Sequence, residues 1–268
     1  MNVIDIGSNS VRLLSNGKKT VITTRLAENM TNGLLNEISI KRTVDGILTL
    51  ANSVTDKCYV FATEAVRSAS NQQLFLEQVK LATGLTVDVI SGDTEAEISY
   101  LGATDGYNSD AVVIDLGGAS CEIIFGKCGK IQYKRSFPFG CVKLYNLFGS
   151  DLNKIRNHVT KTLDELPALA ASKYIAVGGT VTSLAAMAQN LCVYDTNKVH
   201  GYVLTLDDVR RTTKDLLDGK EFATLSYMRK KSILQGAAAL FSIMKRLEIT
   251  NIEISEKDNL EGYCLRLA

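Results

Sequence analysis

Two short stretches of the chain place a carboxylate just before a turn of small residues. Residues 3–14 read VIDIGSNSVRLL and residues 113–124 read VIDLGGASCEII. Aligned without gaps, each has an aspartate, Asp5 or Asp115, near the end of an apolar run and a glycine two residues later. Small residues in such a turn let an anion approach the backbone N–H groups. The repeat predicts a duplicated phosphate-binding device, and two ordinary hairpins with solvated aspartates are the alternative.

The two aspartates predict a divalent cation beside the phosphate. A carboxylate next to a bound phosphate is repulsive unless it holds a cation, directly or through water, so Asp5 and Asp115 suggest Mg²⁺. A centre built from histidine and cysteine is not expected, because the chain has only His158 and His200 and no C-x-x-C pair. The six cysteines are expected to be mainly buried free thiols.

A third turn of small residues occurs in AVGGTVTSLA, residues 176–185, between an expected strand and an expected helix. There Gly178, Gly179 and Thr180 could present N–H groups, a hydroxyl and a helix N-terminus to a phosphate. A threonine cap on a buried helix is the alternative. The chain contains neither a G-x-x-x-x-G-K-[ST] loop nor a G-x-G-x-x-G fingerprint.

Two further residues are candidates for chemistry. In SGDTEAE, Thr94 and Glu97 have the spacing of a capping box, which leaves Glu95 without a local role. We expect Glu95 to point from the first helical turn toward a cleft as a general base, against a merely structural first-turn glutamate. Arg67 follows an expected strand, where its guanidinium could bind phosphate oxygens in a fork or form a surface salt bridge.

The expected strands and helices that position these residues also occur in the same order in both halves of the chain. Each half begins with three expected strands, with Asn16–Gly17 as a hairpin turn in the first half, and continues with alternating helices and strands. The last long helix is expected over 228–248 and the terminal helix over 259–267. This order predicts a duplicated α/β fold, each half a mixed sheet with flanking helices and the active site in the cleft between them. We expect the domains to be 1–107 and 108–268, divided within the polar cluster 105–110.

Bulk properties narrow the functional class. The 268 residues are 46% hydrophobic and 22% charged, with a net charge of +1, which gives no global field toward nucleic acid or a membrane. No apolar stretch reaches the roughly 18 residues of a membrane span, and no basic leader opens the chain, so a cytoplasmic protein is expected. A basic cluster at 229–231 could guide a polyanion if it lines the mouth of the cleft. The sequence does not decide between a monomer and a homodimer.

Several of these segments together resemble the exopolyphosphatase and guanosine pentaphosphate phosphohydrolase (Ppx/GppA) family of the actin-like, ribonuclease H-like ATPase superfold. The matching stretches include DIGSNSVRLL, ATEAVRSASN, ISGDTEAEISYLGA, DLGGASCEIIFG, SFPFGCVKL, AVGGTVTSLA, HGYVL and EISEKDNLEGYCL, and they span almost the whole chain in the family's order. The resemblance implies a metal-dependent hydrolase that releases terminal phosphate from inorganic polyphosphate, with pppGpp or a related guanosine tetra- or pentaphosphate as another ligand.

The resemblance also implies a role for each candidate residue. Glu95 is the implied base for the attacking water, and Arg67 the implied phosphate clamp, with Arg12 as a second one. Asp115 and Glu122, with Asp5 opposite, are the implied ligands of Mg²⁺ or Mn²⁺. The implied phosphate cradle consists of Ser8, Asn9, Ser10, Gly117, Gly118, Ser120, Gly179 and Thr180.

Three departures from the family pattern qualify these implications. Ala119 stands where the family usually has a third glycine, and MRKKSILQG lacks the acid that often follows the arginine. The chain also stops after the two actin-like halves, which favours short phosphate chains or a nucleotide. A non-catalytic polyphosphate- or nucleotide-sensing module and an ATP-dependent small-molecule kinase remain the alternatives.

Overall fold

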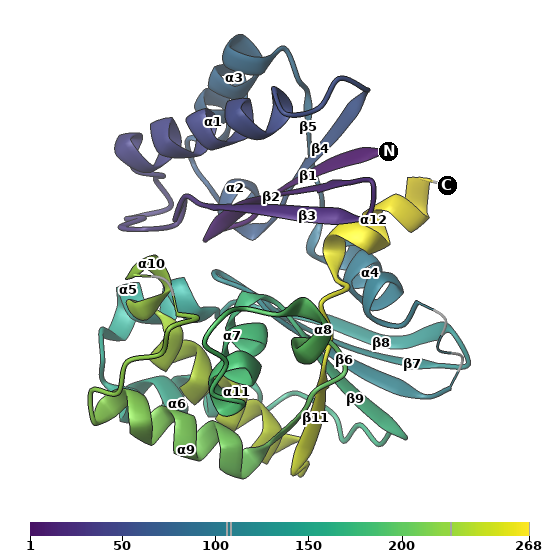
Figure 1. The fold of residues 1–268 in the computed structure, drawn as a ribbon, viewed down its shortest axis with the longest axis vertical. Coiled ribbons are helices and arrows are strands. Elements are labelled where there is room, and N and C mark those ends of the chain that lie inside the picture. The colour runs from purple at the N-terminus through teal and green to yellow at the C-terminus, as the bar shows by residue number, and fades with distance from the viewer. Residues whose placement is uncertain (106, 108, 226, 268) are drawn as a thin grey trace.

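The computed structural model describes residues 1–105, 107, 109–225 and 227–267, and they form two lobes that each contain one sheet (Figure 1). The first sheet has the strand order β3-β2-β1-β4-β5 and the second has β10-β11-β9-β6-β7-β8. The strands are β1 (Asn2–Ile6), β2 (Ser10–Ser15), β3 (Lys18–Thr23), β4 (Cys58–Ala62), β5 (Val87–Val89), β6 (Ala111–Leu116), β7 (Cys121–Lys127), β8 (Lys130–Phe137), β9 (Lys173–Val177), β10 (Val203–Thr205) and β11 (Asn251–Ile254).

Helices flank both sheets. In the first part of the chain they are α1 (Glu37–Ala51), α2 (Glu64–Arg67), α3 (Gln72–Thr83) and α4 (Gly92–Ala103). The second part contains α5 (Cys141–Phe148), α6 (Leu152–Thr162), α7 (Gly179–Ala188), α8 (Thr196–Val199), α9 (Leu206–Leu217), α10 (Tyr227–Lys230), α11 (Ile233–Arg246) and α12 (Asn259–Leu267). Among the described residues, no helix is both long and apolar enough to cross a bilayer.

The two sheets repeat one topology, which confirms the duplicated α/β fold. Strand β1 is antiparallel to β2 and parallel to β4, and β6 is likewise antiparallel to β7 and parallel to β9. Every residue of β1 and β6 is buried, as expected for central strands covered on both faces. The Asn16–Gly17 turn is also confirmed, because both residues have the positive φ (49° and 74°) that a tight hairpin requires.

Some local predictions are wrong. Helix α4 begins at Gly92, two residues before the predicted cap, and the Ser91 hydroxyl accepts the Thr94 N–H, so Thr94 and Glu97 form no capping box. Glu97 instead pairs with Lys134 at 2.6 Å. The helix predicted over 228–248 is divided into α10 and α11, because Ser232 leaves the helical conformation (φ −128°, ψ 1°).

The cysteines also differ in part from expectation. All six are free, but only Cys121 and Cys141 are buried, whereas Cys128 and Cys192 are exposed.

Helices α4 and α12 lie beside one another at the junction of the lobes (Figure 1). On α4, Ala96 and Tyr100 pack into a cluster with strands of the second sheet. The C-terminal helix α12 returns to the first sheet, where Tyr263 stacks on Phe61 with ring centroids 4.5 Å apart. The predicted domain boundary remains a prediction, because Gly106 and Asn108 lie outside the described residues.

The contact between α4 and α12 depends on two glycines. A Cβ added to Gly262 would lie 1.7 Å from the Ile98 carbonyl oxygen, and one added to Gly102 would lie 2.0 Å from the Asp258 carbonyl oxygen. The two helix backbones therefore approach more closely than any side chain allows.

We predict that Gly262→Ala lowers the free energy of unfolding by about 1–3 kcal/mol, because overpacking must separate the two helices. This sign is opposite to helix propensity, which favours alanine over glycine by roughly 1 kcal/mol in a free helix. Urea denaturation measures the change. Leu265→Ala, at a residue of the same helix that is 46% exposed, is the control and should shift stability by less than about 0.5 kcal/mol. A Gly262→Ala protein as stable as the wild type would contradict the proposed constraint.

Candidate active site

The two repeated turns have the same local geometry. The Gly7 N–H donates to the Ser10 carbonyl at 3.0 Å, and the Gly117 N–H donates to the Ser120 carbonyl at 3.1 Å. A Cβ at Gly7 or Gly117 would lie only 3.2 or 3.1 Å from that same carbonyl oxygen, so both positions favour glycine. The strand pairing also matches, because Asp5 lies opposite Arg12 and Asp115 lies opposite Glu122.

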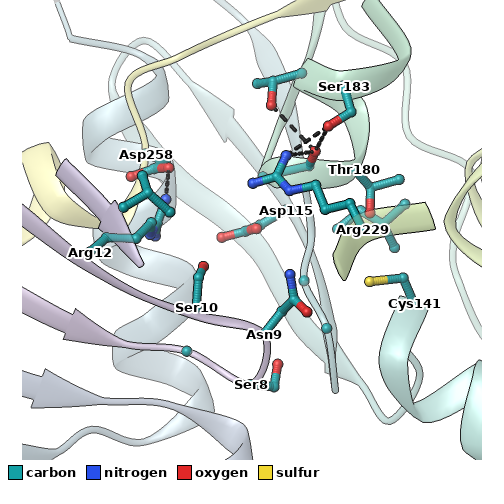
Figure 2. A pocket seen from close by; sticks show the side chains of 18 of the residues that line it. Ser8, Asn9, Ser10, Arg12, Asp115, Cys141, Thr180, Ser183, Arg229 and Asp258 are labelled. Carbon is teal, nitrogen blue, oxygen red and sulfur yellow. Dashed lines mark hydrogen bonds and ion pairs between the residues drawn. The ribbon is translucent and has the colours of Figure 1, made fainter. Parts of the chain in front are cut away.

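The turns meet across the junction of the lobes. A Cβ added to Gly118 would lie 2.4 Å from the Ser8 hydroxyl oxygen, so the second turn touches the first. Together they line a cavity of about 480 Å³. Asp115 lies within it, with Ser8, Asn9 and Ser10 on the facing side (Figure 2). Of the residues predicted for the site, the cavity is lined by Asp5, Ser8, Asn9, Ser10, Arg12, Glu95, Asp115, Gly117, Gly118, Ser120, Gly179 and Thr180.

The third turn brings a helix N-terminus to the same cavity. Helix α7 begins at Gly179, and Gly178 has φ 103° with room for no Cβ, since one would lie 2.8 Å from the Leu116 carbonyl oxygen. Thr180 is buried in the first turn, and the N-cap residue, Gly178, has no side chain with which to cap the helix. The N-terminus of α7 therefore faces the space between the two repeated turns.

Glu95 points into the cavity and is only 5% exposed. Arg67 donates to it through Nη1 at 2.9 Å. Burial raises the pKa of Glu95 to about 8, and nearby Asp115 and Asp5 add to this increase while Arg67 opposes it. A carboxyl with a pKa near neutrality, held in place by an arginine, is suited to exchange a proton with a bound water.

The two repeat aspartates are buried as well. Burial, followed by repulsion from Asp258, raises the pKa of Asp115 to about 6, although Arg12 and a hydrogen bond from Ser99 at 3.0 Å oppose this. Burial also raises the pKa of Asp5, against the attraction of Arg12. The Asp5 Oδ1 atom is buried and has no hydrogen-bond partner among the described residues.

Two predicted site residues do not line the cavity. Arg67 is held by three acceptors, namely Glu95, the Ile90 carbonyl at 2.7 Å and Glu64 at 2.5 Å. Glu122 is 1% exposed and accepts a hydrogen bond from Ser136 at 2.6 Å. Burial, with repulsion from Glu95 and Asp115, raises the pKa of Glu122 well above its ordinary value.

Sequence reasoning missed the ion pairs that tie the C-terminal segment to this site. Arg12, predicted as a second phosphate clamp, donates through Nε to Asp5 at 2.9 Å. It also pairs with Asp258, as Figure 2 shows. Lys19 lies 3.3 Å from Asp258 and 2.8 Å from Glu261. Burial alone would raise the pKa of Asp258, but Arg12 and Lys19 outweigh it and lower the pKa to about 2. The acid was visible in EISEKDNLEGYCL, but its partners lie more than 200 residues away.

The basic cluster 229–231 contributes one residue to the site. Arg229 lines the cavity and donates through Nη1 to the Gly179 carbonyl at 2.5 Å and the Ser183 hydroxyl at 2.7 Å (Figure 2). Lys230 pairs with Glu221 at 3.0 Å, and Lys231 lies 3.8 Å from Glu28 of the other lobe.

We predict that Glu95→Gln reduces the pH dependence of stability. A carboxyl whose pKa is about 8 when folded and about 4.3 when unfolded contributes stability that is fully present below pH 4 and is lost as pH rises through 8. One such proton changes the free energy of unfolding by roughly 1 kcal/mol per pH unit between those values. Melting temperatures from pH 5 to 8, measured with a chelator, should therefore fall less for the variant than for the wild type. Glu97→Gln, in the same helix, should follow the wild type; identical slopes for all three proteins would contradict the assignment.

Comparison with known proteins agrees with this geometry. The sequence matches the Ppx/GppA phosphatase family over residues 3–268. It is 29% identical to the bifunctional 3-dehydroquinate synthase/phosphatase of Fusobacterium nucleatum, over 98% of this chain and 46% of that protein. It is 27% identical to exopolyphosphatase 2 of Mycobacterium tuberculosis, over 99% of this chain and 97% of that protein.

The chain spans only part of some relatives. It covers 57% of a guanosine-5'-triphosphate,3'-diphosphate pyrophosphatase from Photobacterium profundum, at 25% identity over 97% of this chain. Among solved structures, the Aquifex aeolicus PPX-GPPA enzyme aligns with a TM-score of 0.77 and 29% identity, covering 99% of this chain and 98% of that one. These likenesses confirm the duplicated actin-like fold expected from the sequence.

Proposed function

Because the chain belongs to the Ppx/GppA phosphatase family, we propose that it hydrolyses the terminal phosphoanhydride bond of inorganic polyphosphate. The observation that carries this proposal is the meeting of the two repeated turns around one cavity, with the buried carboxyl of Glu95 beside them. Phosphoryl transfer needs mainly positioning and charge neutralisation, and amide groups of both turns and of the α7 N-terminus are available for this.

In the proposed reaction, the terminal phosphoryl group lies among the two turns and the first turn of α7. The N–H groups of Ser8, Gly118 and Thr180 belong to these segments, and Arg229 adds a cation at the α7 end. Glu95 accepts a proton from the attacking water, and Arg67 holds Glu95 in position. The water oxygen bonds to the terminal phosphorus as the bond from that phosphorus to its bridging oxygen breaks, so inorganic phosphate and a shortened chain leave, and Glu95 then releases its proton to solvent.

The site also fits a divalent cation. Among the described residues, no three His, Cys, Asp or Glu side chains lie close enough to hold a metal on their own. Mg²⁺ does not require such a cage, because it commonly uses one or two carboxylates and completes its shell with water and substrate phosphates. Asp115 and Asp5, whose Oδ1 atom is buried without a partner, are the proposed ligands. Mg²⁺ would neutralise phosphate charge there. Glu122, which lies opposite Asp115 in the strand pair and outside the cavity wall, would not contact the cation directly.

A guanosine polyphosphate such as pppGpp is a second candidate substrate. Some relatives are named for that activity, and the same phosphate-binding segments would serve it. The exopolyphosphatase of Mycobacterium tuberculosis aligns over 97% of its own length, so we rank inorganic polyphosphate first.

We predict that the wild-type protein releases phosphate from polyphosphate only when a divalent cation is present. Glu95→Gln should lower kcat by roughly 10²–10⁴-fold, because it removes the base while preserving side-chain shape. Phosphate release is measured for tripolyphosphate, long-chain polyphosphate, pppGpp and ATP, with Mg²⁺, with Mn²⁺ and with chelator.

An Asp115 variant tests the proposed cation site, and an Asp110 variant is its control. Asp115→Asn should raise the Mg²⁺ concentration that gives half-maximal rate, whereas Asp110→Asn, immediately before the same strand and outside the cavity, should not. The reaction products separate the competing functions. ADP formation that requires an added acceptor would indicate a kinase. Tight polyphosphate binding without turnover of any substrate would indicate a sensor and would contradict the hydrolase assignment.

A further inference from the structure

The side chains that line the cavity become more exposed from its buried end to its solvent end. Glu95 and Asp115, at the buried end, are 5% and 6% exposed. Tyr194, which lines the same cavity, is 38% exposed, and Thr196 beside it is exposed. Because Glu95 and Tyr194 line one cavity, a phosphate chain whose end lies beside Glu95 can extend toward Tyr194.

On the other side of the lobe junction from α8, near α5 and α10, two contacts join the lobes (Figure 1). There the Asn146 side-chain amide donates to the Ala27 carbonyl at 2.8 Å, and Lys231 lies 3.8 Å from Glu28. Both contacts join one lobe to the other. A phosphate chain can therefore leave the cavity on the exposed side near Tyr194.

An acidic residue, Glu256, lies in the wall at this solvent end, with one contact to its carboxylate and two to its backbone. The Tyr194 hydroxyl donates to the Glu256 side chain. The Glu256 N–H donates to His200 Nδ1 at 3.2 Å, and the Glu256 carbonyl accepts a hydrogen bond from Lys19. Within the described part of the chain, no lysine or arginine nitrogen lies within 4 Å of the Glu256 carboxylate.

The cations nearby are already matched by acids. Arg12 is shared by Asp5 and Asp258, and Lys19 by Asp258 and Glu261. With Glu256 added, the four acids Asp5, Asp258, Glu261 and Glu256 outnumber the three cations Arg12, Lys19 and Arg229, and Arg229 is itself attracted by Glu256. A phosphate chain that extends past the turns therefore meets net negative charge, whereas its first few phosphoryl groups meet the amides of the turns.

We propose that Glu256 is a specificity-determining residue that restricts the site to short inorganic phosphate chains, such as tripolyphosphate. This inference rests on the proposed hydrolase function and adds to it the substrate class. Tyr194 and His200, from the YDTNKVHG segment at 194–201, act as positioning residues that hold Glu256 in the wall.

The test is the ratio of kcat/KM for long-chain polyphosphate to kcat/KM for tripolyphosphate. Glu256→Gln keeps an acceptor for Tyr194 but removes the charge, and it should raise this ratio roughly three- to tenfold, the effect of one unit charge at a distance of about 4 Å in water. Glu256→Lys should raise it further and provides a second variant if the first does not fold. Because salt screens the repulsion, the ratio for the wild type should also rise with ionic strength, and that of Glu256→Gln should rise less.

Glu253→Gln is the matched control, since it removes an acid from β11 that pairs with Lys173 at 2.8 Å and does not line the cavity. Its ratio should equal that of the wild type. A wild type that favours long chains, or Glu256 variants with an unchanged ratio, would overturn the chain-length inference while leaving the hydrolase intact. Absence of phosphate release from every substrate would overturn the proposed function itself, and the inference with it.

Discussion

Four buried carboxylates lie around the junction of the two lobes, those of Asp5, Glu95, Asp115 and Glu122. Removal from water raises the pKa of each, and repulsion from neighbouring carboxylates, including that of Asp258, adds to the increase. Arg12 and Arg67 compensate only part of this, because Arg12 also serves Asp258 and Arg67 also serves Glu64. Such a group of acids is stabilised by protons or by a divalent cation, and a cation held there attracts phosphate.

The fold supplies the rigid surroundings that this arrangement needs. Strand pairing fixes both aspartates in the same register, so each lobe presents its turn of small residues at the end of a fully buried central strand. Helices α4 and α12 hold the lobes together through backbone contacts at Gly102 and Gly262. The chain that enters α12 also delivers Glu256 and Asp258 to the cavity, so the packing of the last helix and the charge of the site are linked.

Much of this could be predicted from the sequence, because the signals are local. Asp5 and Asp115 were recognisable by their identical place before a glycine turn, and a repeat of that kind fixes both topology and facing geometry. Glu95 was recognisable because no capping role used it, although the cap itself is Ser91 and not Thr94. The roles of Asp258, Lys19 and Glu256 could not be predicted, because their partners come from strands and loops far along the chain. Arg229 belonged to a recognisable basic cluster, but only tertiary packing separates it from its two exposed neighbours.

The central claim is that one phosphate chain is held by both repeated turns at once. A crystal structure of the Glu95→Gln protein with tripolyphosphate and Mg²⁺ tests it most directly. We expect the terminal phosphoryl oxygens to accept hydrogen bonds from amides of both the 7–10 and the 117–120 turns, with the cation between Asp5 and Asp115. A chain bound to one turn alone, or outside the cavity, would contradict this account.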